Sequence, residues 1–279
     1  MTATTVTGVA SRPLPSTLRI GLSRGGAEIR QFFRERSAVV FTFALPTAIL
    51  ILLGFIFDAP LDDVPGTRLS QVFAAGMIAY GILATAFISV GIGIAGDRED
   101  GTLKRLRGTP ASATAYLIGK IVLVAVTTAA EVVMMLAAGV LLFDLQLPSD
   151  VGRWVTFAWL MALSVVACTL LGIAASTLAG SARSAPAVMN LPVLALQFTS
   201  GIFVQVSMLP DAMLTVASLF PVKWMGQGFR SVFLPDQLAA QEVAGSWEHG
   251  RIALVLGAWC LLGLVLCLAT FRWTDRRTR

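Results

Sequence analysis

The chain has 279 residues, of which 56% are hydrophobic and only 13% are charged, and its formal net charge is +5. Soluble domains carry about 25% charged residues. This composition excludes an ordinary soluble domain and indicates a polytopic all-α membrane protein. Most basic residues flank the ends of apolar runs, so the positive charge orients the chain in a bilayer and gives no indication of nucleic acid binding.

The N-terminal region changes character at about residue 18. Residues 1–17 are rich in Thr, Ser and Pro and are predicted to be disordered, and no short apolar run with a cleavage site precedes Ser37, so no cleavable signal peptide is expected. Residues 18–36 are predicted to form an amphipathic helix on the cytoplasmic membrane surface. Its continuity is in question at Gly25-Gly26, and the alternative is a flexible basic tail. The residues that share its apolar face are Leu18, Leu22, Ile29, Phe32 and Phe33.

Six apolar segments follow, and each is expected to cross the bilayer, which needs roughly 20 residues. Pro46 predicts a kink in the first, which neighbouring helices can accommodate. Small residues at four-residue spacing predict close helix packing in the fourth. Residues 18–279 are therefore expected to form a single transmembrane domain. The segments lie at about 38–57, 71–96, 114–143, 154–179, 186–204 and 251–271.

The segment 97–110 is densely charged and separates two long apolar runs. A charged hairpin between two spans must lie in water at one membrane face. Asp97 or Asp100 can cap a short helix, Leu103 and Leu106 share one of its faces, and Gly108 ends it. Two interpretations follow. The hairpin is either a cationic helix that docks onto a soluble partner or a solvated loop whose arginines only fix the topology.

The order of residues in this hairpin resembles that of a known family. Glu99-Asp100-Gly101-Thr102-Leu103-Lys104-Arg105-Leu106, then Thr109-Pro110 and Gly119-Lys120, is similar to the first cytoplasmic loop of ABC-type exporter permeases of the type 2 family, nearest the drug and antibiotic exporter branch. The resemblance implies that this loop carries a coupling helix that docks into an ATPase subunit. The docking residues it implies are Glu99, Gly101, Thr102, Leu103, Lys104, Arg105, Leu106 and Arg107.

The segment 205–250 mixes short apolar pieces with prolines and charged residues. Its runs are too short to span a bilayer, so a re-entrant or interfacial structure is expected. The series Ser200-Gly201-Ile202-Phe203, Leu209-Pro210 and Phe220-Pro221 again resembles the exporter family. That resemblance implies two short helices that enter from the outer face before the last span.

Glu131 lies within the third apolar segment, near its middle. A carboxylate at that depth is costly and is a candidate functional group. Thr127 and Thr128, one turn away, are expected to hydrogen-bond it. Glu131 either takes part in cation binding or proton transfer, or joins helices as a protonated acid. Lys120, nearer the start of the segment, is expected to extend to the cytoplasmic headgroups.

No other side chains form a convincing chemical site. Cys168, Cys260 and Cys267 lie in apolar runs and are interpreted as small buried residues, not as disulfide partners or metal ligands. His249 is the only histidine, so it cannot build a metal site without other ligands. Gly119-Lys120 is followed by Ile121, and no Gly stands at Thr114, so the phosphate-binding P-loop pattern is not met.

Charge predicts the orientation of the chain. The N-terminal segment, hairpin 97–110, turn 180–185 and the C-terminus carry 15 of the 21 Lys and Arg residues, whereas the other side carries five. The positive-inside rule then places both termini and the hairpin in the cytoplasm of a bacterial cell, with the chain as a multi-pass protein of the inner membrane.

The resemblance implies a membrane subunit of an ATP-driven exporter that moves a hydrophobic or amphipathic substrate, such as a drug, an antibiotic or a lipid-like molecule. The expected partners are a separate ATPase subunit, which would bind ATP and Mg, a second permease subunit, identical or different, and the lipid bilayer. No cofactor is expected in this chain. The main alternative is a proton-coupled secondary transporter that uses Glu131, although no internal repeat supports it. A membrane enzyme lacks paired carboxylates or a nucleophile with its base, and a scaffold without transport is the fourth class.

Overall fold

The computed structural model describes residues 16–61, 64–108 and 112–270. Most of the tail predicted to be disordered, Pro110 and the C-terminal arginines lie outside these residues. The described chain is helical, and the one β-feature given for it is an isolated antiparallel bridge between Pro60 and Arg68. The fold class predicted from composition, an all-α protein, is confirmed.

Five of the helical segments are long and apolar enough to cross a membrane, and they coincide with five of the six predicted spans. The first is α2 (Arg36–Ile56), and the second is the continuous segment formed by α3 (Leu69–Ile82), π-helical η1 (Leu83–Ser89) and α4 (Val90–Glu99). The third is α6 (Ala113–Phe143), and the fourth is α7 (Val151–Ala175) with the short η2 (Ser176–Leu178). The fifth is α11 (His249–Thr270).

The predicted span at 186–204 is shorter than expected. It forms α8 (Ala185–Thr199), which has 15 residues and measures about 22 Å at 1.5 Å per residue. The hydrocarbon core is about 30 Å thick. The helix ends because Gly201, two residues beyond it, takes a left-handed conformation with φ of 75°. Pro192 lies inside α8, and Pro186 is accommodated in its first turn, where no amide donor is needed.

The segment of α3, η1 and α4 is the central element of the fold. Nearly every residue of α3 is buried, because α2, α6 and α10 (Pro221–Phe233) all pack against it. A π-helical turn adds one residue to the ring of each hydrogen bond, and such turns are frequent at functional sites. Within this turn the side-chain hydroxyl of Ser89 also donates to the carbonyl of Ala84, at 3.0 Å. The added width brings the Phe87 backbone against Gly172 of α7, where a methyl group would lie 2.6 Å from the Phe87 carbonyl oxygen.

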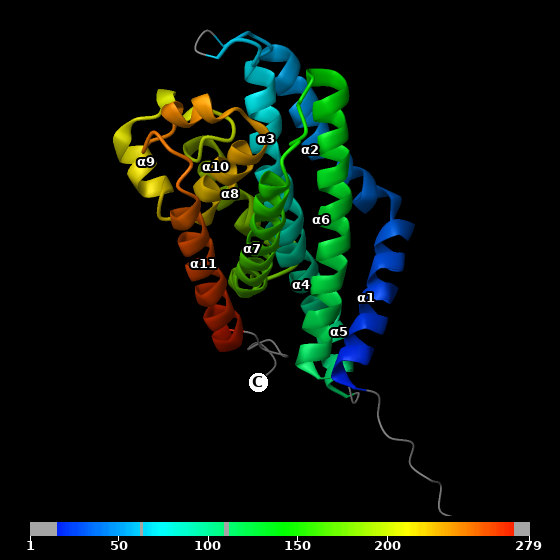
Figure 1. Cartoon of the computed structure of the whole chain (residues 1–279). Helices are drawn as coiled ribbons and strands as arrows, with labels where there is room; N and C mark the ends of the chain where they lie inside the picture. Colours follow the sequence, from blue (N-terminus) through cyan, green and yellow to red (C-terminus); the bar gives the residue numbers. More distant parts are fainter. Residues whose placement is uncertain (1–15, 62–63, 109–111, 271–279) are drawn as a thin grey trace, which may run out of the picture.

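The N-terminal amphipathic helix is α1 (Thr17–Arg34), and it stands beside the first half of α6 (Figure 1). The expected break at Gly25-Gly26 is wrong, because α1 is continuous through both glycines. Gly21 and Gly25 are one turn apart and form the contact surface. A methyl group on Gly21 would lie 2.6 Å from Ile118, and one on Gly25 would lie 2.7 Å from Val122. These glycines therefore permit close packing of the two helices.

The segment 205–250, expected to hold two short helices, contains α9 (Asp211–Ala217) and α10, flanked by the 3₁₀ turns η3 (Val206–Met208) and η4 (Asp236–Gln241). Every residue of α10 is buried between α3, α7 and α11. Figure 1 places α5 (Thr102–Arg107), the start of α1 and the end of α11 at one end of the molecule. The end of α6 and the start of α3 lie at the opposite end.

Candidate functional site

The charged hairpin forms the short helix α5, and its two leucines do not face solvent equally. Leu103 is fully buried within the chain's own core, and Leu106 packs partly against that core. The interpretation of Leu103 as a direct docking contact is therefore not supported by its position. Burial of Leu103 instead packs α5 against the chain's own core.

The start of α5 also differs from the prediction. Neither Asp97 nor Asp100 caps it. Its N-cap is Gly101, with φ of 72°, and no side chain bonds to the cap. A left-handed conformation at this position favours glycine, because other residues meet a steric penalty there. Gly101 therefore turns the chain sharply between α4 and α5, and Gly108 follows the helix as predicted.

The hairpin presents two basic side chains to solvent. Lys104 and Arg105 are exposed, and Arg105 donates to the Asp100 carbonyl and the Thr102 hydroxyl, each at 3.3 Å. The side chain of Arg107 lies outside the described residues. Glu99 accepts a hydrogen bond from the backbone of Ala182, so it fastens the hairpin to the turn after α7. Among the side chains of α5 that the structure describes, Lys104 and Arg105 therefore form the exposed cationic surface.

Sequence reasoning missed an ionic cluster beside the hairpin. The Lys120 amine lies 2.8 Å from the Asp97 carboxylate and 3.2 Å from Glu28 of α1. Arg24 pairs with Glu28 at 3.0 Å, and the Tyr116 hydroxyl donates to Asp97 at 2.8 Å. Lys120 was predicted to extend to the headgroups, but it is only 12% exposed and joins α1, α4 and α6. The partners are distant in sequence, so no local pattern indicated the cluster.

Glu131 is completely buried where α6 faces the π-helical turn. Its carboxylate accepts a hydrogen bond from Thr85 of η1. The expected contact with Thr127 or Thr128 is wrong. The Thr127 hydroxyl donates to backbone carbonyls at 2.9 and 3.2 Å, and the Thr128 hydroxyl has no partner. No described Lys or Arg forms an ion pair with Glu131, and its second oxygen, Oε1, is unpartnered.

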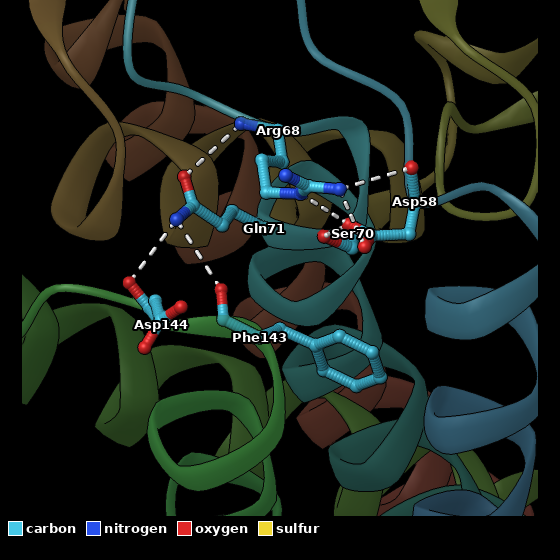
Figure 2. Close-up of polar contacts among 6 residues, drawn as sticks. All are labelled: Asp58, Arg68, Ser70, Gln71, Phe143 and Asp144. Carbon is cyan, nitrogen blue, oxygen red and sulfur yellow. Dashed lines mark hydrogen bonds and ion pairs between the residues drawn. The ribbon is translucent and has the colours of Figure 1, made fainter.

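At the opposite end of the molecule, Asp58, Arg68, Ser70 and Gln71 form a hydrogen-bonded group that we call the Asp58 clasp (Figure 2). Arg68 binds both carboxylate oxygens of Asp58, at 2.5 and 2.6 Å, and Ser70 donates to Asp58 at 2.8 Å. These hydrogen bonds, that of Arg68 first, lower the pKa of Asp58. Gln71 donates to the carbonyls of Phe143 and Asp144, at 3.3 and 3.1 Å. The clasp thus joins the loop after α2 to the start of α3 and to the end of α6.

The cysteines are free thiols, of which Cys168 and Cys267 are buried and Cys260 is half-buried. Within residues 16–61, 64–108 and 112–270, no group of three or more His, Cys, Asp or Glu side chains could hold a metal ion. His249 instead lies 2.9 Å from the hydroxyl of Ser231. The candidate functional site is therefore the charged hairpin, together with the contacts that anchor it.

A comparison with protein families matches residues 25–234 to the ABC-2 type transporter family. The chain belongs to this family. The match begins within α1 and ends just after α10, so it includes the hairpin, Glu131 and both short outer helices. The chain is also similar to the inner membrane transport permease YadH of Escherichia coli K12, and equally to YadH of Shigella flexneri. Each is 23% identical over 191 residues, covering 67% of this chain and 72% of the relative.

As an ABC-2 permease, the chain is a non-catalytic transmembrane component of a transporter. Its five long apolar helices and its similarity to YadH make it a multi-pass permease of the inner membrane. Permeases of this family work with ABC ATPase subunits. Because the chain belongs to this family, the hypotheses of a self-sufficient secondary transporter, a membrane enzyme and a scaffold are set aside.

Proposed function

We propose that this ABC-2 permease is the membrane subunit of an exporter that moves a hydrophobic or amphipathic substrate, such as a drug, an antibiotic or a lipid-like molecule, out of the cell. A separate ATPase subunit binds ATP and Mg and drives the cycle. Two permease subunits, identical or different, form the pathway. In each subunit α8 is the fifth of six spans, α1 lies at the cytoplasmic interface, and α9 and α10 enter from the outer face. Both termini are then cytoplasmic.

The observation that carries this proposal is the arrangement of α5. Buried Leu103 fixes the helix to the core, whereas Lys104 and Arg105 point outward. Glu99 joins the hairpin to Ala182 after α7, and Arg98 donates to the Ser176 carbonyl at 3.1 Å. A partner that pushes on α5 therefore acts on two spans at once. This is what a coupling helix requires.

Exposed apolar side chains on α8 support the choice of substrate class. Leu191, Leu194 and Phe198 project from α8, each at least half exposed. A pathway built from such helices suits an apolar or amphipathic molecule better than a hydrated sugar, because unpaired polar groups are costly to bury. Export, not uptake, rests on the resemblance of the hairpin to the exporter branch.

Co-purification tests the proposal. The tagged chain is extracted in mild detergent from its native host, and the sample is examined for a P-loop ATPase. The test variant carries Lys104→Glu and Arg105→Glu, which reverse the exposed charge but keep Leu103 in the core. Arg30→Glu is the matched control, because Arg30 is an exposed arginine of α1.

We expect the ATPase with the wild type and with Arg30→Glu, and its loss from the double variant. Retention by the double variant would remove Lys104 and Arg105 from the docking contact. Absence of an ATPase from all three samples would refute the exporter assembly itself. When the complex is obtained, stimulation of its ATP hydrolysis by hydrophobic compounds identifies the substrate.

A further inference from the structure

A large cavity lies inside the subunit, between α1, α2, the segment of η1 and α4, and α6. Its volume is about 730 Å³. Cavities that hold drug-sized ligands measure about 300–1,000 Å³. All of its lining residues belong to one subunit, and its open side is edged by exposed residues such as Glu35, Phe41 and Asp100.

The charged residues of its lining are predominantly acidic. Four carboxylates and two basic side chains contribute to it. The two basic groups, Arg24 and Lys120, are already neutralised by Glu28 and Asp97 in the ionic cluster. The other two carboxylates belong to Glu35 and Asp100, and neither forms an ion pair with a described residue. The lining therefore holds two carboxylates that form no ion pair with a described residue, although Arg105 lies beside Asp100 and donates to its carbonyl at 3.3 Å.

The remaining lining is apolar with a few hydroxyl groups. Phe32, Phe41 and Leu123 provide aromatic and aliphatic surface, and Thr85 and Ser89 provide hydroxyls from the π-helical turn. Thr85 is the residue that donates to Glu131. A molecule that fills the cavity would thus touch the element that holds the buried carboxylate. Aromatic surface beside these carboxylates is complementary to a cation on an apolar body.

We infer that this cavity binds an amphipathic organic cation, with its apolar body against Phe32, Phe41 and Leu123 and its charge beside Glu35 and Asp100. The inference rests on the proposed export function, because it names the class of substrate that the subunit accepts from the cytoplasmic side. It locates that substrate within one subunit.

Two glycines of α4 provide a matched test of the location. Gly93 lines the cavity, and a methyl group added there would meet no atom within 4 Å. Gly93→Leu therefore fills the cavity without displacing the backbone. Gly96 lies one turn further along α4, is equally free of close contacts and does not line the cavity. Gly96→Leu is the control for any general effect on the helix.

Binding is measured on the purified full chain in phosphatidylcholine nanodiscs, with tetraphenylphosphonium as the probe and empty discs as background. Tetraphenylborate, which has the same shape and the opposite charge, is measured separately. We expect saturable binding of the phosphonium, at least tenfold weaker with Gly93→Leu and unchanged with Gly96→Leu. Glu35→Gln and Asp100→Asn should each weaken it about two- to fivefold, the range of a solvent-accessible ion pair. Asp211→Asn, at an exposed carboxylate of α9, should have no effect.

Three results would overturn the inference. Equal binding by the Gly93→Leu and Gly96→Leu variants would place the probe elsewhere. Equal affinity for tetraphenylborate would show that charge has no role. Loss of probe binding when phosphatidylethanolamine replaces phosphatidylcholine would assign the cavity to a lipid amine. Because the permease is measured without its ATPase, failure here leaves the co-purification result untouched, and the reverse also holds.

Discussion

Thr85 donates a hydrogen bond to Glu131, and this contact joins the π-helical turn η1 to α6 across 46 positions of the sequence. Both side chains are buried, and the second carboxylate oxygen of Glu131 has no partner. At this depth the π-helical turn is thus connected to α6 by the hydrogen bond between Thr85 and Glu131.

Thr85→Val should destabilise the permease by about 1–3 kcal/mol, because it leaves a buried carboxyl group without its donor. Thr85→Ser keeps the hydroxyl and should have a much smaller effect. The free energy of unfolding, measured by titration with SDS, distinguishes the two. Equal stability of the Val and Ser variants would show that the hydrogen bond contributes nothing.

Glu131→Gln should reduce substrate transport more than it reduces assembly. The amide oxygen can still accept the hydrogen bond from Thr85, so the contact between η1 and α6 persists. The side chain can no longer ionise or release a proton. Transport into inverted membrane vesicles is compared with the yield of monodisperse protein. Unchanged transport would restrict Glu131 to a structural role.

Adjacent glycines of α1 should respond in opposite ways to alanine. Gly25→Ala should destabilise the protein by about 1–3 kcal/mol, because the new methyl group would lie 2.7 Å from Val122 of α6. Gly26→Ala should be neutral or stabilising by up to about 1 kcal/mol, since no atom lies within 4 Å of the added group and alanine favours a helix. Thermal unfolding in detergent measures both. The same loss from both variants would contradict the packing of α1 on α6.

The shared cation of the ionic cluster should matter to stability. Lys120→Met leaves Glu28 and Asp97 without it, and we expect a loss of about 1–3 kcal/mol, below the 3–5 kcal/mol of a fully buried pair because solvent screens part of the interaction. Arg183→Met, at an exposed basic residue, serves as the control and should change little. If both variants unfold at the same denaturant concentration, the cluster is not stabilising.

The Asp58 clasp should make stability depend on pH in the acidic range. The pKa of Asp58 is lowered from 3.8, chiefly by the hydrogen bond from Arg68. A carboxyl group whose folded-state pKa lies below its unfolded value adds stability that is fully present above about pH 4–5 and is lost as pH falls through the folded-state pKa.

Thermal midpoints of the wild type and of Asp58→Asn, recorded from pH 6 down to pH 3, test this effect. The wild type should be the more stable at pH 6, and the difference should shrink as the pH falls. A constant difference across the range would exclude titration of Asp58 as its cause.

The two short helices before the last span were implied by the family resemblance. The sequence pattern by itself determined the fold class, five of the apolar spans and the position of the charged hairpin. These features follow from the length and periodicity of apolar runs, which are local properties of the chain. The hairpin motif also determined the family, because its residues are contiguous. The fifth predicted span, 186–204, differed because Gly201 ends α8 early.

Only the tertiary structure decided which side chains meet. Leu103 is part of the core and not of an exposed docking face, Lys120 binds Asp97 and Glu28, and Glu131 receives its hydrogen bond from Thr85 and not from Thr127 or Thr128. Periodicity gives the face of a helix that a residue occupies, but it does not give the neighbouring helix or the rotation between them. That depends on close packing, here on Gly21 and Gly25 against α6 and on the wider π-helical turn against Gly172.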